Sequence, residues 1–224
     1  MSAILQPAIF SFLQDLRENN DRDWFNANKP IYQEQLANFK AFANEVLDHL
    51  STHDEIEQLK VFRIYRDVRF SKDKSPYKTN FSAGFTRATK FRRGGCFLSV
   101  EPEEVFVAGG FWAPESADLK RIRKELAADA QPLRDIIAET AFVDTFGELA
   151  GNQLKSAPAG YPKDHPNIDL LRYKQYLLTR RFTIQAATQA GFAQTISDTF
   201  ATMRPFFDYM TDVLTTDENG VPIE

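Results

Sequence analysis

The sequence contains very little cysteine and histidine, and it has no long hydrophobic run. Its single cysteine, Cys96, excludes an internal disulfide and favours a reducing compartment. Three histidines leave few candidates for a hydrolytic triad, and no GxSxG nucleophile motif is present. The sequence also has neither a run of about 18 apolar residues nor a basic N-terminal leader. We therefore expect a cytoplasmic protein with no membrane segment and no signal peptide.

Two kinds of binding motif are missing as well. The sequence has no GxxxxGK[ST] stretch and no glycine-rich turn before a helix, so the usual cradle of backbone N–H groups for a phosphate is absent. His49 and His53 have the spacing of two zinc ligands on one helix face. However, no glutamate lies between them in the HExxH register, and His165 is the only other histidine. We expect no metal site.

Aromatic residues, by contrast, are abundant. Of the 224 residues, 20 are Phe, 7 are Tyr, and 43% are hydrophobic. A chain of this size can bury a large core, and aromatic packing should be a main stabilising contribution to it. No repeat or linker divides the sequence. We therefore predict one globular α+β domain over residues 1–214 and a disordered acidic tail over 215–224.

Residues 62–70 alternate between apolar and polar side chains, which is the period of a strand with one buried face. The apolar face of this predicted strand consists of Phe62, Ile64, Val68 and Phe70. Arg66 falls on the same face, where an unpaired guanidinium would be very costly. Asp67 or Asp73 is the nearest carboxylate that could pair with it. A charged loop over 71–76 should follow, and then a returning strand.

The same patterns extend along the rest of the chain. The predicted strands are 62–70, 79–85, 96–100, 105–108 and, after several helices, about 176–183. Helix-period patterns predict helices around 9–16, 30–50, 116–126, 132–137, 167–173 and 192–214, the last one broken at Pro205. Consecutive strands with short links favour an antiparallel meander. The fold class is therefore α+β, a mainly antiparallel sheet of about four to five strands packed by N-terminal and C-terminal helices.

Positive charge is concentrated in residues 61–93, called here the basic segment. It has ten Lys or Arg residues and two Asp, a balance of +8, while the whole chain carries -4 and the remainder therefore -12. A local basic patch on an acidic protein favours a compact anion such as a phosphate or a carboxylate, whereas extended duplex binding would better fit a basic whole domain. We therefore take the basic segment as the candidate site.

Several residues of this segment are candidates for contact with a small phosphate-bearing ligand. The candidate site residues are Arg63, Arg66, Asp67, Arg69, Lys72, Asp73, Lys74, Tyr77 and Lys78. The expected charge clamps among them are Arg69, Lys72, Lys74 and Lys78. Tyr77 offers a stacking or hydroxyl contact, and Asp67 or Asp73 an orienting acceptor, a general base or one ligand of Mg²⁺. The pattern specifies no reaction and no cofactor.

Two other interpretations stay open. The basic segment is also compatible with a non-catalytic interaction module that docks an acidic protein or single-stranded nucleic acid, although the sequence has no RNA-recognition signature. It is equally compatible with a structural role, in which Arg66 and its carboxylate partner form an ion-paired element that fixes the loop. Convergence of the basic side chains on one concave volume would favour the ligand site.

Four blocks of the sequence together resemble a known family. The longest is Arg66-Asp67-x-Arg69-Phe70-Ser71-Lys72-Asp73-Lys74-Ser75-Pro76-Tyr77-Lys78, and the others are Trp24-Phe25 with the residues before it, Gly110-x-Trp112-x-Pro114, and Gly160 to Pro166. On these residues the chain resembles a bacterial and fungal family of conserved hypothetical proteins, a domain of unknown function. The resemblance implies a single-domain protein of about this length, and no activity, cofactor or catalytic residue.

Overall fold

The computed structural model describes residues 4–89, 91–217 and 221–222. Its centre is a five-stranded antiparallel sheet in which each strand pairs with the next one along the chain. The strands are β1 (Ile56–Val61), β2 (Phe81–Arg87), β3 (Gly95–Val100), β4 (Glu104–Phe111) and β5 (Tyr176–Thr183). The predicted α+β class and antiparallel meander are therefore confirmed.

The helices form three groups along the chain. Those before the sheet are α1 (Pro7–Glu18), α2 (Arg22–Ala27) and α3 (Lys29–Leu50). Those between β4 and β5 are α4 (Ser116–Ala128), α5 (Gln131–Ala138), α6 (Thr140–Phe146) and α7 (Ile168–Leu171). Those after the sheet are α8 (Ile184–Ala187), α9 (Phe192–Thr202) and α10 (Arg204–Thr215), where Pro205 in the first turn of α10 marks the predicted break.

The first predicted strand is the main error of the sequence reading. The strand lies at Ile56–Val61, whereas residues 62–80 leave the sheet and return to it as a long loop. Of the apolar positions in the alternating pattern over 62–70, Ile64 is buried as a strand would require, but Phe70 at the end of the pattern is 96% exposed. After Phe62, which bonds to Ser82, these residues lie beside no strand of the sheet, because β2 begins at Phe81; instead Tyr65 forms an isolated bridge with Tyr77 across the loop.

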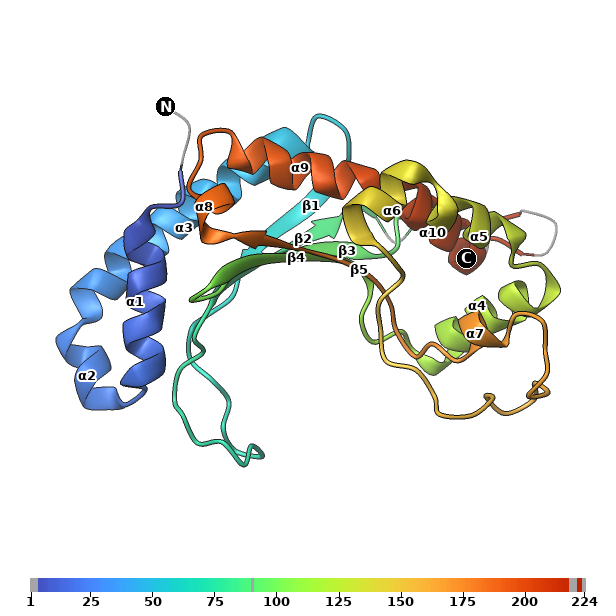
Figure 1. Cartoon of the computed structure of the whole chain (residues 1–224), viewed down its shortest axis with the longest axis horizontal. Helices are drawn as coiled ribbons and strands as arrows, with labels where there is room; N and C mark the ends of the chain where they lie inside the picture. Colours follow the sequence, from blue (N-terminus) through green and yellow to red (C-terminus); the bar gives the residue numbers. More distant parts are fainter. Residues whose placement is uncertain (1–3, 90, 218–220, 223–224) are drawn as a thin grey trace.

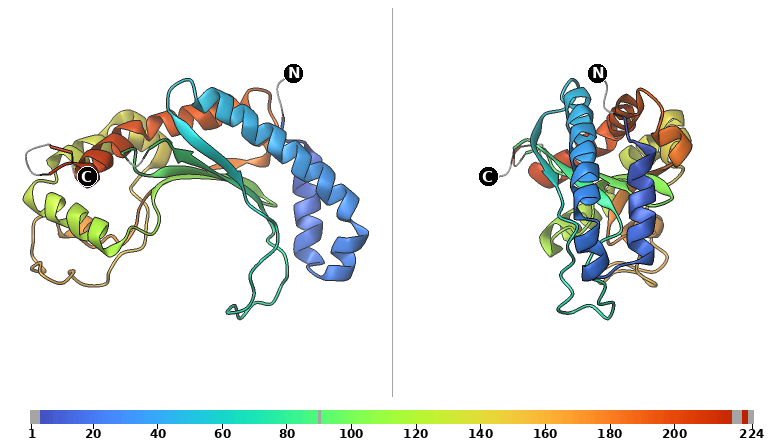
Figure 2. Two further views of the ribbon diagram at one scale, coloured as in Figure 1. Left: turned by 180° about the vertical axis from the view of Figure 1, so that it is seen from behind. Right: turned by 90° about the vertical axis from the view of Figure 1, so that its left-hand side faces the viewer.

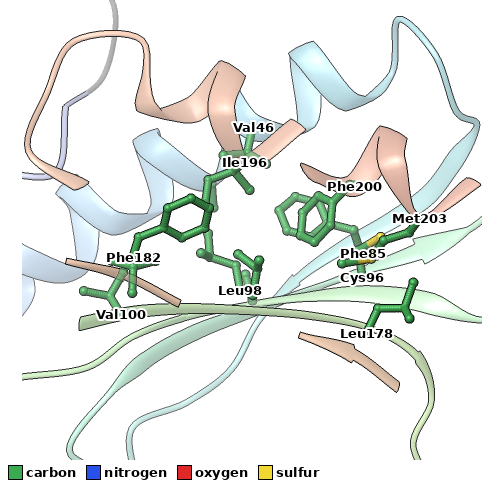
Figure 3. Packing of buried hydrophobic residues seen from close by; sticks show 14 of the residues in the cluster. Val46, Phe85, Cys96, Leu98, Val100, Leu178, Phe182, Ile196, Phe200 and Met203 are labelled. Atoms are coloured by element: carbon green, nitrogen blue, oxygen red, sulfur yellow. The ribbon is translucent and has the colours of Figure 1, made fainter. Parts of the chain in front are cut away.

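One face of the sheet carries the hydrophobic core. Helices α3 and α9 lie across this face, and the strand side chains beneath them point into the space between (Figure 1; Figure 3). Figure 3 shows this packing with Val46, Phe85, Cys96, Leu98, Val100, Leu178, Phe182, Ile196, Phe200 and Met203 labelled. On β2 the side chains of Phe81, Ala83 and Phe85 are buried on this face.

The other face of the sheet is concave and has no helix across its middle in the described part of the chain (Figure 1; Figure 2). At one end of the arch, α1 and α2 stand beside the loop 62–80. At the other end, α4, α7 and the segment 147–167 form a second support. The molecule is thus an arch whose underside is the second face of the sheet.

An ion-pair network fastens the end of β2 to the helices. The side chain of Arg87 is 1% exposed, and its Nε donates to Asp54 at 2.8 Å and an NH2 to Asp208 at 3.2 Å. Arg92 and Arg204 also reach Asp54, each at 3.5 Å. The basic segment is therefore divided, because this end of it is occupied by internal ion pairs.

Two further expectations concern the membrane and the tail. Among residues 4–89, 91–217 and 221–222, no helix is long and apolar enough to cross a membrane. The predicted tail 215–224 lies partly outside the described residues. Within the described part, α10 ends at Thr215 and a single bridge pairs Thr216 with Pro222.

We expect Arg87→Met to lower the free energy of unfolding by about 3 kcal/mol or more, because it removes the closest partner of a buried carboxylate. The matched variant is Arg134→Met, which breaks a pair with Asp169 (2.7 Å) between partly exposed side chains and should cost under about 1 kcal/mol. Urea unfolding measures both losses. Equal losses would contradict the view that the network at Asp54 holds β2 to the helices.

Candidate functional site

The loop 62–80 has a fixed neck and an exposed tip. We call residues 62–66 and 75–80 the neck, and residues 67–74 the tip. The two arms of the neck are joined by backbone hydrogen bonds, from Arg66 N to Pro76 O at 2.9 Å and from Lys78 N to Ile64 O at 2.7 Å. Tyr77 is buried, and its ring stacks on Phe25 of α2 with centroids 3.9 Å apart. The neck is therefore packed onto the N-terminal helices.

Asn20, just after α1, adds a second connection to the neck. Its Nδ2 donates to the carbonyl of Tyr77 at 3.0 Å, and its Oδ1 accepts from the N–H of Tyr77 at 3.1 Å. A side-chain amide here takes the place of a neighbouring strand, since it satisfies both backbone groups of one residue. The position of the neck relative to α1 follows from this pair of bonds.

A cleft of about 440 Å³ lies between the end of α1 and the neck. Its lining residues are Arg17, Asn20, Arg66, Asp73, Ser75, Tyr77, Lys78, Thr79 and Asn80. Four of them belong to the predicted set, namely Arg66, Asp73, Tyr77 and Lys78. The side chains that form this cleft come from α1, the neck and the approach to β2, so it is a composite of three parts of the chain.

Arg66 pairs with Asp73, one of the two partners expected from the sequence. Ser75 donates to the same carboxylate through its hydroxyl (2.6 Å) and its backbone N–H (2.9 Å). These hydrogen bonds, first that of the Ser75 hydroxyl and then that of Arg66, hold the pKa of Asp73 well below its usual range. Asp73 is therefore a poor general base, and its charge balances that of Arg66.

Lys78 is the one cation of the predicted set in the cleft wall that has no carboxylate partner within residues 4–89, 91–217 and 221–222. Its ammonium lies 5.7 Å from the ring centroid of Phe62, and that of Lys60 lies 5.6 Å from the same centroid. Burial lowers the pKa of Lys78, and the nearby positive charge of Arg63 lowers it further. Lys60 and Lys78 near Phe62 thus carry positive charge without a carboxylate partner in the described part of the chain.

Apart from Asp73, the described lining of the cleft includes no residue of the tip. Arg69 pairs with Asp67 at 2.6 Å, and this hydrogen bonding lowers the pKa of Asp67. Lys74 donates to the carbonyl of Val68 at 3.0 Å. Of the four expected charge clamps, Arg69, Lys72 and Lys74 lie on the exposed tip and only Lys78 lines the cleft. Arg63 is exposed on the neck and does not line it either.

Sequence reasoning missed the residues that other elements bring to the cleft. Arg17 reaches it from the last turn of α1, where it also pairs with Glu103 at 2.8 Å. Asn80 reaches it from the start of β2 and donates to the Ser99 hydroxyl at 2.7 Å. The sequence holds no local signal for these contacts.

Other candidates for chemistry are absent from the cleft. Cys96 is buried, and burial raises the pKa of its thiol. His49 lies near Glu45, while His53 contacts the buried Ser197 at 2.8 Å. Over the residues that the structure describes, no group of three or more His, Cys, Asp or Glu side chains has an arrangement suited to a metal ion.

Comparison with known proteins gives one match. A family model described as "Conserved hypothetical protein (DUF2461)" matches residues 8–209, which include the whole cleft and the whole sheet. No curated protein matches the chain. The family description names no activity, so the function has to be argued from the site.

The bonds of Asn20 to Tyr77 predict a specific loss of stability. We expect Asn20→Ala to lower the free energy of unfolding by about 1 to 3 kcal/mol, because both backbone groups of a buried residue lose their partner. Asn19→Ala is the matched control, since the Asn19 side chain bonds only within its own helix, to Asp15 O at 2.9 Å. Urea unfolding and amide hydrogen exchange at Tyr77 measure the effect. Similar, small changes in both variants would contradict the role given to Asn20.

Proposed function

The chain belongs to the DUF2461 family of conserved hypothetical proteins, and we propose that it binds a small phosphate-bearing anion in the cleft between α1 and the neck of the loop 62–80. One observation carries this proposal. Lys78 lines the cleft beside Arg63 and has no carboxylate partner among the described residues. A partly buried charge without a counter-ion is unfavourable, and a bound anion would supply the missing charge.

The two arginines of the cleft support the proposal. Arg66 and Arg17 each pair with one carboxylate, Asp73 and Glu103 respectively. A guanidinium has five N–H donors in a planar fork, so one carboxylate does not exhaust its capacity. These side chains therefore keep donors for a second oxyanion. Because each is already held by its carboxylate, less side-chain entropy is lost when a ligand binds.

The proposal is limited to binding. Hydrogen bonds lower the pKa of both candidate carboxylates, Asp67 and Asp73, which makes them poor proton acceptors near neutral pH. The cleft offers side-chain donors in place of a backbone cradle, so the ligand would be recognised mainly by charge. A cytoplasmic location, expected from the single cysteine, remains a prediction.

Thermal unfolding with inorganic phosphate and pyrophosphate tests the proposal. At low ionic strength we expect stabilisation, which for a ligand at a hundred times its Kd is about 2.7 kcal/mol. Lys78→Met should abolish the gain, and Lys72→Met, which removes an exposed lysine of the tip outside the cleft, should keep it. If neither anion shifts the Tm, or if the two variants behave alike, the cleft is not the anion site.

The titration of Lys78 gives an independent measurement. Burial and Arg63 place its pKa below that of an ordinary lysine, so its charged form is disfavoured in the free protein. A bound anion favours the charged form, so phosphate should raise the pKa of Lys78, as followed by NMR of the lysine side chains. The side-chain NMR signals of Lys72, which lies outside the cleft, should not respond to phosphate. An unchanged Lys78 titration in saturating phosphate would argue against direct contact.

A second function, docking of an acidic protein, is favoured by the tip. Phe70 is 96% exposed there, with the guanidinium of Arg69 at 6.0 Å from its ring centroid and Lys72 and Lys74 nearby in the chain. An exposed aromatic ring among cations is a common anchor for a partner. We expect Phe70→Ser to weaken binding of a labelled peptide of alternating Asp and Leu residues, and Lys78→Met to leave it unchanged. Equal binding by Phe70→Ser would exclude the tip as the anchor.

A further inference from the structure

The concave face of the sheet carries an aromatic layer outside the core. Side chains directly opposite each other in antiparallel strands point to the same face, so the register defines rows. One row across the five strands is Phe62, Ser82, Ser99, Phe106 and Arg181, in which Phe62 N bonds to Ser82 O at 2.9 Å. The next row is Lys60, Gly84, Phe97, Ala108 and Thr179.

By this register, three rings share one face of the sheet. It is the face that α3 and α9 leave uncovered, as the ribbon in Figure 2 shows. Phe62, Phe97 and Phe106 are partly exposed and are not members of the buried core. The rings of Phe62 and Phe97 have centroids 6.1 Å apart. The Phe62 ring packs over Gly84, where a Cβ would meet it at a van der Waals distance of 3.4 Å. Ser82, Ser99 and Ala108 between the rings are buried, so a planar ligand would lie over the partly exposed rings.

Cations border the aromatic layer at both sides. Lys60 and Lys78 lie near the Phe62 ring, and the guanidinium of Arg181 lies 4.8 Å from the ring centroid of Phe106. Arg181 pairs with Glu104, so the uncompensated charge is on the side of β1, with Lys60 and Lys78. Lys78 also lines the cleft, which means that the cleft and the aromatic layer share a border.

We propose that the concave face binds a short single-stranded nucleic acid, with bases stacked over Phe97 and Phe106 and phosphates at Lys60 and Lys78. The proposal rests on the proposed anion site, which would hold a further phosphate of the same strand. Stacking on aromatic side chains beside a basic track is how single strands are bound without sequence preference, and guanidinium groups such as that of Arg181 also stack on bases.

The ring layer favours this ligand over two others. An acidic protein would satisfy the lysines but has no regular series of planar groups for the rings. A duplex hides the faces of its bases, and the chain outside the basic segment carries a balance of -12, which opposes a long polyanion. Phe62 and Phe106 are separated by three strand spacings, about 14 Å, which suits the two or three bases that sheets of this kind stack.

Fluorescence anisotropy with a labelled thymidine oligonucleotide of about ten nucleotides tests the inference, using the whole chain. We expect Phe97→Leu and Phe106→Leu each to weaken binding at least about fivefold, the effect of losing one stacked base. Leucine keeps an apolar side chain at each position of the strand. An unchanged Tm would show that both variants remain folded. Phe91→Leu is the matched control, because this exposed phenylalanine lies in the turn between β2 and β3, outside the layer.

Two competitors separate the possible ligands. An abasic oligonucleotide of equal length should bind at least about fivefold more weakly than the thymidine strand, because it keeps the phosphates and lacks the bases. For three phosphate contacts, the logarithm of the affinity should fall with that of the salt concentration with a slope of about -2. If poly-glutamate or the abasic strand binds as well as the thymidine strand, the face recognises charge alone and the inference is wrong.

The outcome also distinguishes this inference from the anion site. If phosphate stabilises the wild type and Phe97→Leu equally while no oligonucleotide binds, only the nucleic-acid inference fails. If the oligonucleotide binds in a way that depends on Phe97, and phosphate has no effect on the Tm, then the anion site in the cleft fails. Loss of both signals in Lys78→Met, with the oligonucleotide signal alone lost in Phe97→Leu, is the result expected if both hold.

Discussion

The hydrophobic core lies on one face of the sheet, and the alternation of side chains along each strand decides which residues lie on the other face. Phe81, Ala83 and Phe85 point toward α3 and α9, so Ser82 and Gly84 between them must point away. Burial on one side therefore determines the composition of the concave side. The rings of Phe97 and Phe106 lie there because their neighbours Leu98 and Val107 fill the core.

The positive charges at the two ends of β2 also differ in their surroundings. At its far end Arg87 is enclosed by Asp54 and Asp208, so its positive charge is used within the protein. Before its near end Lys78 has an aromatic ring beside it and no carboxylate partner in the described chain. The basic segment therefore contains one part whose positive charges form internal ion pairs and another part, at Lys78, whose positive charge has no carboxylate partner in the described chain. The ion pairs of Arg87 give that end a structural role, and a ligand site near Lys78 remains a proposal.

The sequence predicted those elements whose pattern had a physical partner. The strands over 79–85, 96–100 and 176–183 were found because period-two alternation coincided with pairing to a neighbour. The pattern over 62–70 was just as clear, but no strand was available to pair with it, and periodicity alone cannot show that. Asp73 was one of the two partners expected for Arg66, because it is close to Arg66 in sequence, and the structure shows this pair. Arg17 and Asn80 were missed because their approach depends on the tertiary fold.

The hydrogen bonds across the neck hold the base of the loop 62–80 in place and leave its tip free of these bonds. Arg66 and Lys78 join the two arms, and Asn20 fixes Tyr77 to the end of α1, all of them on the sheet side of the tip. A protease that cuts after the exposed Arg69 or Lys72 would sever the chain without releasing either arm. The two fragments would stay associated as one folded body, and residues 67–72 can vary in length without altering the sheet.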